Sequence, residues 1–93
     1  MRKRFSGRAK LSPALVLREE SDDYAILYNP DTTEAYAINP IGVQVCRMLD
    51  GAHTVSDLAA SIREEFSDVP ENVEGDIREF IGALIACNLA SEQ

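Results

Sequence analysis

The hydrophobic pattern changes its period at Asn39-Pro40, and this change limits the folds open to the chain. Before it, apolar residues alternate or gather in short runs, which is typical of β-strands. After it, apolar residues recur every three or four positions, as on the buried face of a helix. Asn39 is a good helix cap, and Pro40 fits the first turn of a helix. The chain therefore places its strands first and its helices second.

Three short strands are expected before this boundary, over residues 15–20, 24–28 and 34–38. Polar turns separate them, and the second turn contains Pro30. Because short turns connect neighbouring antiparallel strands, the three strands should form a meander. The third strand then lies at an edge of the sheet, where one row of main-chain groups is unpaired.

Three helices are expected after the boundary. The first ends before Gly51, which suits the left-handed position that follows a helix. The second begins with Thr54 as its cap and has Asp57 three residues further on. The third covers Glu71 to Asn88. Since a sheet with one apolar face must bury it under the helices, the predicted fold class is α+β, a three-stranded antiparallel sheet followed by three helices, winged helix-turn-helix-like.

Charge is distributed unevenly along the chain. Residues 1–10 hold five of the nine basic residues and none of the sixteen acidic ones, so the remainder is strongly acidic. Residues 1–11 lack periodicity and are expected to be a disordered basic arm. A folded domain over residues 12–90 and a tail over residues 91–93 should follow. An acidic domain repels nucleic acid, because nucleic-acid binding depends on Lys and Arg.

The sequence also argues against a membrane or secreted protein. The longest apolar run, Phe80 to Cys87, is far shorter than the roughly 20 residues of a membrane helix. The basic start of the chain is followed by polar residues rather than by the apolar segment of a signal peptide. We therefore expect a cytoplasmic protein without a membrane partner.

Few residues of the chain suit catalysis or metal binding. Cys46 and Cys87 are far apart in apolar surroundings, and we interpret both as small buried hydrophobes. His53, the one histidine, falls in a loop and should be exposed. A structural zinc site needs about four ligands, and acid–base catalysis needs a histidine or perturbed carboxylates in a cleft. We expect no enzymatic activity, no metal site and no cofactor.

The expected third strand offers a place for another segment to pair. Its outward residues, Ala35 and Ala37, are small and uncharged, so no bulky group guards the edge. In the third helix an apolar sector comprises Val73, Ile77, Phe80 and Leu84. Ile81 and Ile85 widen this sector; they either pack under the first helix or the N-terminal strand, or they line a groove beside the edge. An edge beside an apolar helix is suited to strand addition, in which main-chain hydrogen bonds supply affinity.

Several motifs occur together in a specific order. They are Tyr36-Ala37-Ile38-Asn39-Pro40-Ile41-Gly42, Leu49-Asp50-Gly51, Thr54-Val55-Ser56-Asp57-Leu58 and Asp76-Ile77-Arg78-Glu79-Phe80-Ile81. With this order and spacing, residues 12–90 resemble the PqqD family, whose namesake is a peptide chaperone of pyrroloquinoline quinone (PQQ) cofactor biosynthesis. The resemblance implies a winged-helix-like RiPP recognition element that does not bind DNA.

The resemblance also implies partners and a site. Members of the family bind the leader of a ribosomally made precursor peptide and deliver it to a modifying enzyme, often a radical SAM enzyme. The leader adds to the third strand and lies against the third helix. Carried over to this sequence, the peptide-binding residues are Glu34, Ala35, Tyr36, Ala37, Ile38, Ile77, Arg78, Phe80, Ile81, Leu84 and Ile85. Because subfamilies serve many peptide pathways, the precursor and the enzyme stay open.

Two alternatives follow from the same pattern. The second and third helices also resemble a DNA-binding helix-turn-helix, so a winged-helix regulator is the second hypothesis. Its recognition helix would carry four acidic residues against one basic residue over positions 71–79, which disfavours DNA. A sheet with an open edge could also form a homodimer by strand exchange.

Overall fold

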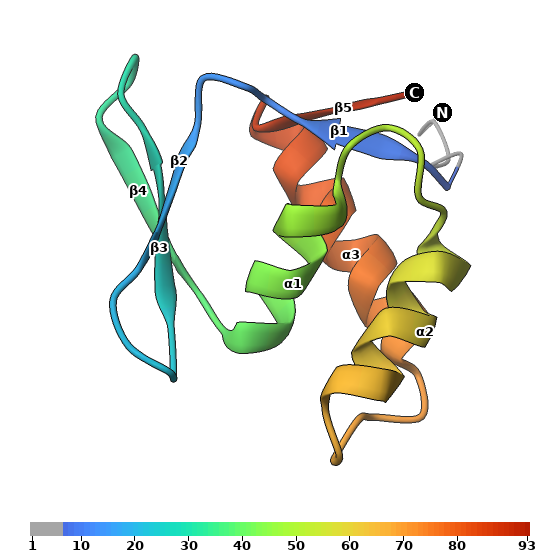
Figure 1. Cartoon of the computed structure of the whole chain (residues 1–93). Helices are drawn as coiled ribbons and strands as arrows, with labels where there is room; N and C mark the ends of the chain where they lie inside the picture. The colour runs from blue at the N-terminus through green and yellow to red at the C-terminus, as the bar shows by residue number, and fades with distance from the viewer. Residues whose placement is uncertain (1–6) are drawn as a thin grey trace.

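The computed structural model of the chain describes residues 7–93, and Figure 1 shows how their elements are arranged. The elements are β1 (Ala9–Leu11), β2 (Val16–Glu19), β3 (Ala25–Asn29), β4 (Glu34–Ile38), α1 (Pro40–Met48), α2 (Val55–Glu65), α3 (Val73–Ala86) and β5 (Ala90–Glu92). β2, β3 and β4 form one sheet, with all three helices to one side of it (Figure 1). The predicted α+β class is confirmed.

The three-stranded sheet is an antiparallel meander in the order β2-β3-β4, as predicted. Ala25 faces Ile38, and Leu27 faces Tyr36, across the β3–β4 pair. Ala25, Leu27 and Ile38 are buried and Tyr36 is half-buried, so this face of the sheet closes the apolar core. Within residues 7–93 the core contains no buried polar or charged residue.

The helix starts follow the predicted caps. At the start of α1, the Asn39 side chain accepts a hydrogen bond from the Gly42 N–H at 2.8 Å. At the start of α2, the Thr54 hydroxyl accepts from the Asp57 N–H at 3.2 Å, and the Asp57 carboxylate accepts from the Thr54 N–H at 2.9 Å. This reciprocal capping box satisfies two N–H groups that would otherwise lack partners.

Helix α3 is shorter than predicted at both ends. Asn88 has a φ of 60°, in the left-handed region, and therefore lies outside the helix. The Leu89 N–H donates to the Leu84 carbonyl at 2.8 Å, and the Asn88 N–H donates to the Ile85 carbonyl at 3.0 Å. These two bonds form a Schellman motif, which ends the helix two residues earlier than the apolar spacing suggests.

The two ends of the described chain pair with each other. β1 and β5 form a two-stranded antiparallel sheet in which Leu11 faces Ala90. Ala9 is 1% exposed, and its carbonyl accepts a hydrogen bond from the Gly51 N–H at 3.0 Å. On the same side of β1, the Leu11 N–H donates to the Leu49 carbonyl at 2.9 Å. β1 is therefore held between β5 and the loop that follows α1.

This pairing corrects the sequence analysis. The expectation of a disordered arm over residues 1–11 and a tail over residues 91–93 is wrong where β1 and β5 form. The part of that expectation that concerns residues 1–6 lies outside the described residues. A three-residue strand carries too short a pattern to be recognised, and its partner lies at the other end of the sequence.

Candidate functional site

Strand β4 has one paired edge and one open edge. It pairs with β3 along Glu34–Ile38, and no strand within residues 7–93 pairs with its other side. Ala35 and Ala37 are exposed on the outer face of the sheet. The main-chain N–H and C=O groups on the open side are therefore available to another extended segment. The predicted position of the third strand at a sheet edge is confirmed.

An apolar cleft lies beside the C-terminal end of β4. Its volume is about 390 Å³, and β4, α1, α3 and the loop before α3 enclose it. The side chains that give it its apolar character are Ile38, Ile41, Val45, Val73, Ile77 and Phe80. We call the open edge of β4 (Glu34–Ile38) together with this cleft the β4–α3 site.

Gly42 lets α1 approach the other two walls of the cleft closely. A Cβ atom at this position would lie 3.3 Å from the Ile38 Cβ and 3.4 Å from the Phe80 ring. Both contacts are tighter than ordinary van der Waals packing. The glycine that follows the Asn39 cap therefore brings β4, α1 and α3 together, a role that its place in the motif did not reveal.

One face of α3 extends from the cleft along the sheet. Asp76, Phe80, Ala83 and Cys87 share this face, because they recur at helical spacing. At its far end, burial raises the pKa of the Tyr36 hydroxyl, and the nearby Glu34 carboxylate and Cys87 thiol raise that pKa further. The Tyr36 side chain of β4 is half-buried against the apolar core.

The structure separates the helix residues that the family resemblance implied. Ile77 and Phe80 line the cleft. Ile81 and Leu84 also belong to the buried core, but they are not among the residues that line the cleft. Ile85 is half-buried against the same core. The remaining residue of that set, Arg78, is exposed and is not part of the cleft lining.

Helix α2 explains this separation. The Ser56 hydroxyl of α2 donates to the Glu74 carboxylate of α3 at 3.3 Å, so the Glu74 side of α3 faces α2. Ile81 and Ile85 lie on that side by helical spacing. The apolar surface of α3 is broad because it serves α2 as well as the cleft. Neither Ile81 nor Ile85 is among the residues that line the cleft beside β4.

Sequence reasoning did not place seven of the lining residues in the site: Asn39, Ile41, Gly42, Val45, Pro70, Val73 and Asp76. Helical spacing was a signal for those in α1 and α3. Ile41 and Val45 are four residues apart and therefore share a face of α1. Asp76 is four residues before Phe80, which places its carboxylate on the same side of α3.

The two cysteines and the histidine lie in three separate environments. Burial raises the pKa of the Cys46 thiol to about 11, so this thiol stays protonated near neutral pH. Cys87 is exposed, contrary to the expectation of burial. His53 lies in the loop before α2, with its Nδ1 2.9 Å from the Asp50 Oδ1. Among residues 7–93, no group of three or more His, Cys, Asp or Glu could hold a metal ion.

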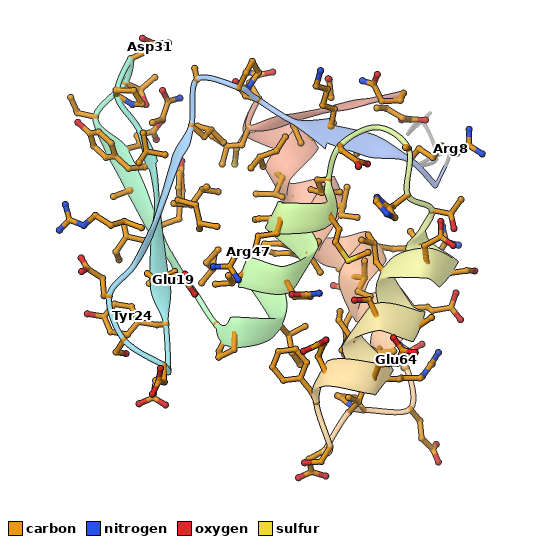
Figure 2. The ribbon with its side chains drawn as sticks, in the orientation of Figure 1. Arg8, Glu19, Tyr24, Asp31, Arg47 and Glu64 are labelled. Carbon is orange, nitrogen blue, oxygen red and sulfur yellow. The ribbon has the colours of Figure 1, made fainter. Side chains whose placement is uncertain are left out.

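A second hollow of about 300 Å³ lies on the other side of α1 and is more polar. There Arg47 of α1 forms an ion pair with Glu19 of β2, and Figure 2 shows the two side chains facing each other. Tyr24, which is 45% exposed, also lines this hollow. The Arg47 guanidinium already has a carboxylate partner there, and the lining of this hollow is mostly polar, unlike the apolar walls of the β4–α3 site.

The fold and the site define the class of protein. The chain is a small winged helix-turn-helix-like domain, in which the wing (β2-β3-β4) leaves one strand edge free beside an apolar cleft. The family described as Coenzyme PQQ synthesis protein D (PqqD) matches residues 24–90, which is most of the chain. The chain belongs to the PqqD family.

Two solved structures are similar to this chain. The structure described as "TbiB1 in Complex with the TbiA(beta) Leader Peptide" is 26% identical, with a TM-score of 0.68 over 87% of this chain and 93% of that chain. The structure described as "Lasso peptide synthetase B1 complexed with the leader peptide" is 19% identical, with a TM-score of 0.69 over 89% of this chain and 96% of that one. The second likeness concerns the fold alone. A search of curated proteins found no similar sequence.

The helices of the described chain are short. No helix among residues 7–93 is long and apolar enough to cross a membrane.

Proposed function

We propose that this chain is a RiPP recognition element that binds the leader of a ribosomally made precursor peptide as an added strand on β4. The observation that carries the proposal is the free edge of β4 beside the apolar cleft. Membership of the PqqD family and the similarity to TbiB1, whose structure holds a leader peptide, support it. The proposal concerns the class of ribosomally made precursor peptides as a whole, and the PQQ precursor is one member of that class.

The site would bind a peptide through two kinds of contact. Main-chain hydrogen bonds to Glu34–Ile38 accept any extended backbone, so they supply affinity without selecting a sequence. The cleft selects a large apolar side chain, whose burial contributes roughly 1.5–3 kcal/mol. Phe80 and Ile77 would contact this side chain, while the buried Ile81 and Leu84 pack in the core and fix the position of α3.

The remaining implied residues have supporting places in this proposal. Tyr36 is half-buried beside the open edge of β4, and Ile85 of α3 packs against the core. Arg78 is exposed, so it is placed to contact a peptide segment or an enzyme that extends beyond the cleft.

The proposed role is non-catalytic presentation of a substrate to a second protein in the cytoplasm. A modifying enzyme, of the radical SAM class or another, would act on the core of the peptide while its leader is held on β4. Holding the substrate beside the enzyme raises its effective concentration to the millimolar range for short linkers. A homodimer formed by strand exchange at β4 would compete with the peptide for the same main-chain groups.

DNA binding is not favoured by any feature of the structure. The exposed surface of α3, which would be the recognition helix, carries Asp76 and Glu79 beside Arg78. Phosphate groups would be repelled there, because affinity for DNA depends on neutralising their charge.

The test of the proposal uses peptides selected on the immobilised protein from a displayed library of random sequences. Phe80→Asp should weaken their binding at least about tenfold, since a charge would enter the apolar cleft. Tyr28→Ser, on the outer face of the sheet, should leave binding unchanged. Fluorescence anisotropy measures both affinities, and circular dichroism confirms that both variants fold.

Amide chemical shifts give an independent readout on the unmodified protein. Adding a selected peptide should shift the amides of Glu34–Ile38 and of Phe80. Shifts confined to α2, or equal affinity of a folded Phe80→Asp variant, would show that the peptide binds elsewhere.

A further inference from the structure

The cleft is apolar but has one charged wall. Asp76 is the single charged residue among those that line it. Within residues 7–93 its carboxylate forms no hydrogen bond or ion pair. Asp76 is exposed, so the carboxylate remains solvated and charged while it borders the apolar surface. It is therefore available to a cation that enters with a ligand.

The charge near Asp76 is negative over a wider area. Positions 71–79 of the chain contain four carboxylates and one guanidinium, that of Arg78. The N-terminus of α3 contributes a positive dipole end of about half an elementary charge, which is too small to reverse this sign. Arg78 is two residues from Asp76 and thus points away from the cleft.

The other basic residues of the described chain lie on other surfaces. They are Arg8 and Lys10 at β1, Arg18 on β2, Arg47 on α1 and Arg63 on α2. Arg18 and Arg47 already pair with Glu20 and Glu19. None of these cations lines the cleft, so the field that a bound segment meets there is set by Asp76 and its acidic neighbours.

We propose that the β4–α3 site selects leader segments in which a large aliphatic or aromatic residue, seated in the cleft, is accompanied within about two positions by Lys or Arg, which pairs with Asp76. Residues two apart on a strand are about 7 Å apart, a distance that the side chain of Lys or Arg can span. The inference rests on the proposed function and adds to it the chemistry of the sequence that is bound. Acidic or neutral segments with the same apolar residue bind less tightly.

The experiment selects peptides from a displayed library of random sequences about twice the length of the five-residue strand β4. The wild-type protein, Asp76→Asn, Asp76→Lys and Glu64→Lys are each used as bait. Glu64→Lys is the matched control for Asp76→Lys. Both variants replace a carboxylate by an ammonium group, but Glu64 lies on α2, away from the cleft (Figure 2). The selected sequences are then aligned on their largest apolar residue.

Wild type and Glu64→Lys should enrich Lys or Arg beside the apolar residue. Asp76→Asn should lose this preference, and Asp76→Lys should replace it with Asp or Glu. For one selected peptide, replacing its Lys by Gln should weaken binding to wild type about two- to fivefold, the range of exposed ion pairs, and leave binding to Asp76→Asn unchanged. The preference should shrink at about 1 M salt, where the Debye length is about 3 Å.

The outcomes separate the inference from the proposed function. If apolar residues are enriched without a neighbouring basic residue, or if the basic preference persists in Asp76→Lys, the role of Asp76 is refuted while peptide binding stands. If no peptide is enriched, or if the selected peptides bind Phe80→Asp as tightly as wild type, the proposed peptide site itself is refuted.

Discussion

Single residues set the pH response of the loop between α1 and α2. The hydrogen bond from His53 to Asp50 raises the pKa of His53 above its usual value. The pKa of Asp50 is lowered, first by the hydrogen bond from the Ala52 N–H and then by His53. Asp50, Ala52 and His53 lie in the same loop as Gly51, whose N–H donates a hydrogen bond to the Ala9 carbonyl of β1. The Asp50–His53 pair therefore stabilises the loop on which the N-terminal strand packs.

We expect this pair to contribute most to stability between about pH 4 and about pH 6.5, the usual pKa values of the two side chains. As pH rises through the raised pKa of His53, the histidine loses its charge and the contribution disappears. As pH falls through the lowered pKa of Asp50, the carboxylate is protonated with the same result. His53→Gln should therefore lower the melting temperature slightly near pH 5.5 and have no effect near about pH 8.5.

The melting temperature is measured by circular dichroism across this pH range, with Asp50→Asn as the matched variant. Asp50→Asn should lose the same gain in stability between alkaline pH and about pH 6.5, while the lost charged acceptor of the Ala52 N–H lowers its melting temperature at alkaline pH as well. A difference between wild type and His53→Gln that grows toward alkaline pH would contradict the assignment.

At the scale of elements, α3 contains Gly82, at a position where the structure does not require a glycine. A Cβ atom at Gly82 would meet no atom within 4 Å, and its φ is that of an ordinary helix. Gly82→Ala should therefore raise the free energy of unfolding by about 0.5–1 kcal/mol, because alanine loses less backbone entropy on folding. Chemical denaturation measures this change.

Gly51→Ala is the matched contrast, because Gly51 has a φ of 86°. An alanine there should cost about 1–2 kcal/mol. If Gly82→Ala destabilises the protein as Gly51→Ala does, the central turns of α3 are not the unstrained helix described here.

At the scale of the whole molecule, β1 and β5 join the ends of the described chain and close the helical side of the domain. The Val55 N–H of α2 donates to the Gly7 carbonyl at 3.1 Å, and the Ser12 N–H donates to the Leu89 carbonyl at 2.8 Å. These bonds lie outside the β4–α3 site, so the N-terminal strand supports the fold without touching the cleft.

Removing residues 1–6 is the control, because this truncation leaves β1 and its hydrogen bonds to the rest of the described chain in place. Removing residues 1–11 deletes β1 and should cost about 3–5 kcal/mol, from lost hydrogen bonds and the exposure of the apolar surface around Ala9. For a domain of this size, the loss corresponds to a fall of well over about 10 °C. Equal melting temperatures for the two truncated chains would contradict a structural role for β1.

Much of the fold was predictable because it depends on neighbouring residues. The meander requires only short turns between the strands, and the caps at Asn39 and Thr54 act within three residues of themselves. The edge position of β4 follows from the same local order. The β1–β5 pair was missed, because it joins segments from opposite ends of the sequence and neither strand is long enough to show a pattern.

Some residues of the candidate site were predictable from the sequence and others were not. Glu34–Ile38, Ile77 and Phe80 were expected, while Asp76 and the α1 wall were not. Periodicity gives the width of an apolar helix face, but it does not say which part of that face meets which neighbour. Packing against α2 decides that question, since it buries Ile81 and leaves Phe80 at the cleft.

The sequence by itself determined the order of the three-stranded meander and the three helices, the caps of α1 and α2 and the open edge, because each depends on interactions between residues close in the chain. The tertiary structure alone decided where the cleft lies, which carboxylate borders it and how the ends of the chain join. These features depend on distances between elements that are far apart in sequence, and such distances are set only when the core packs.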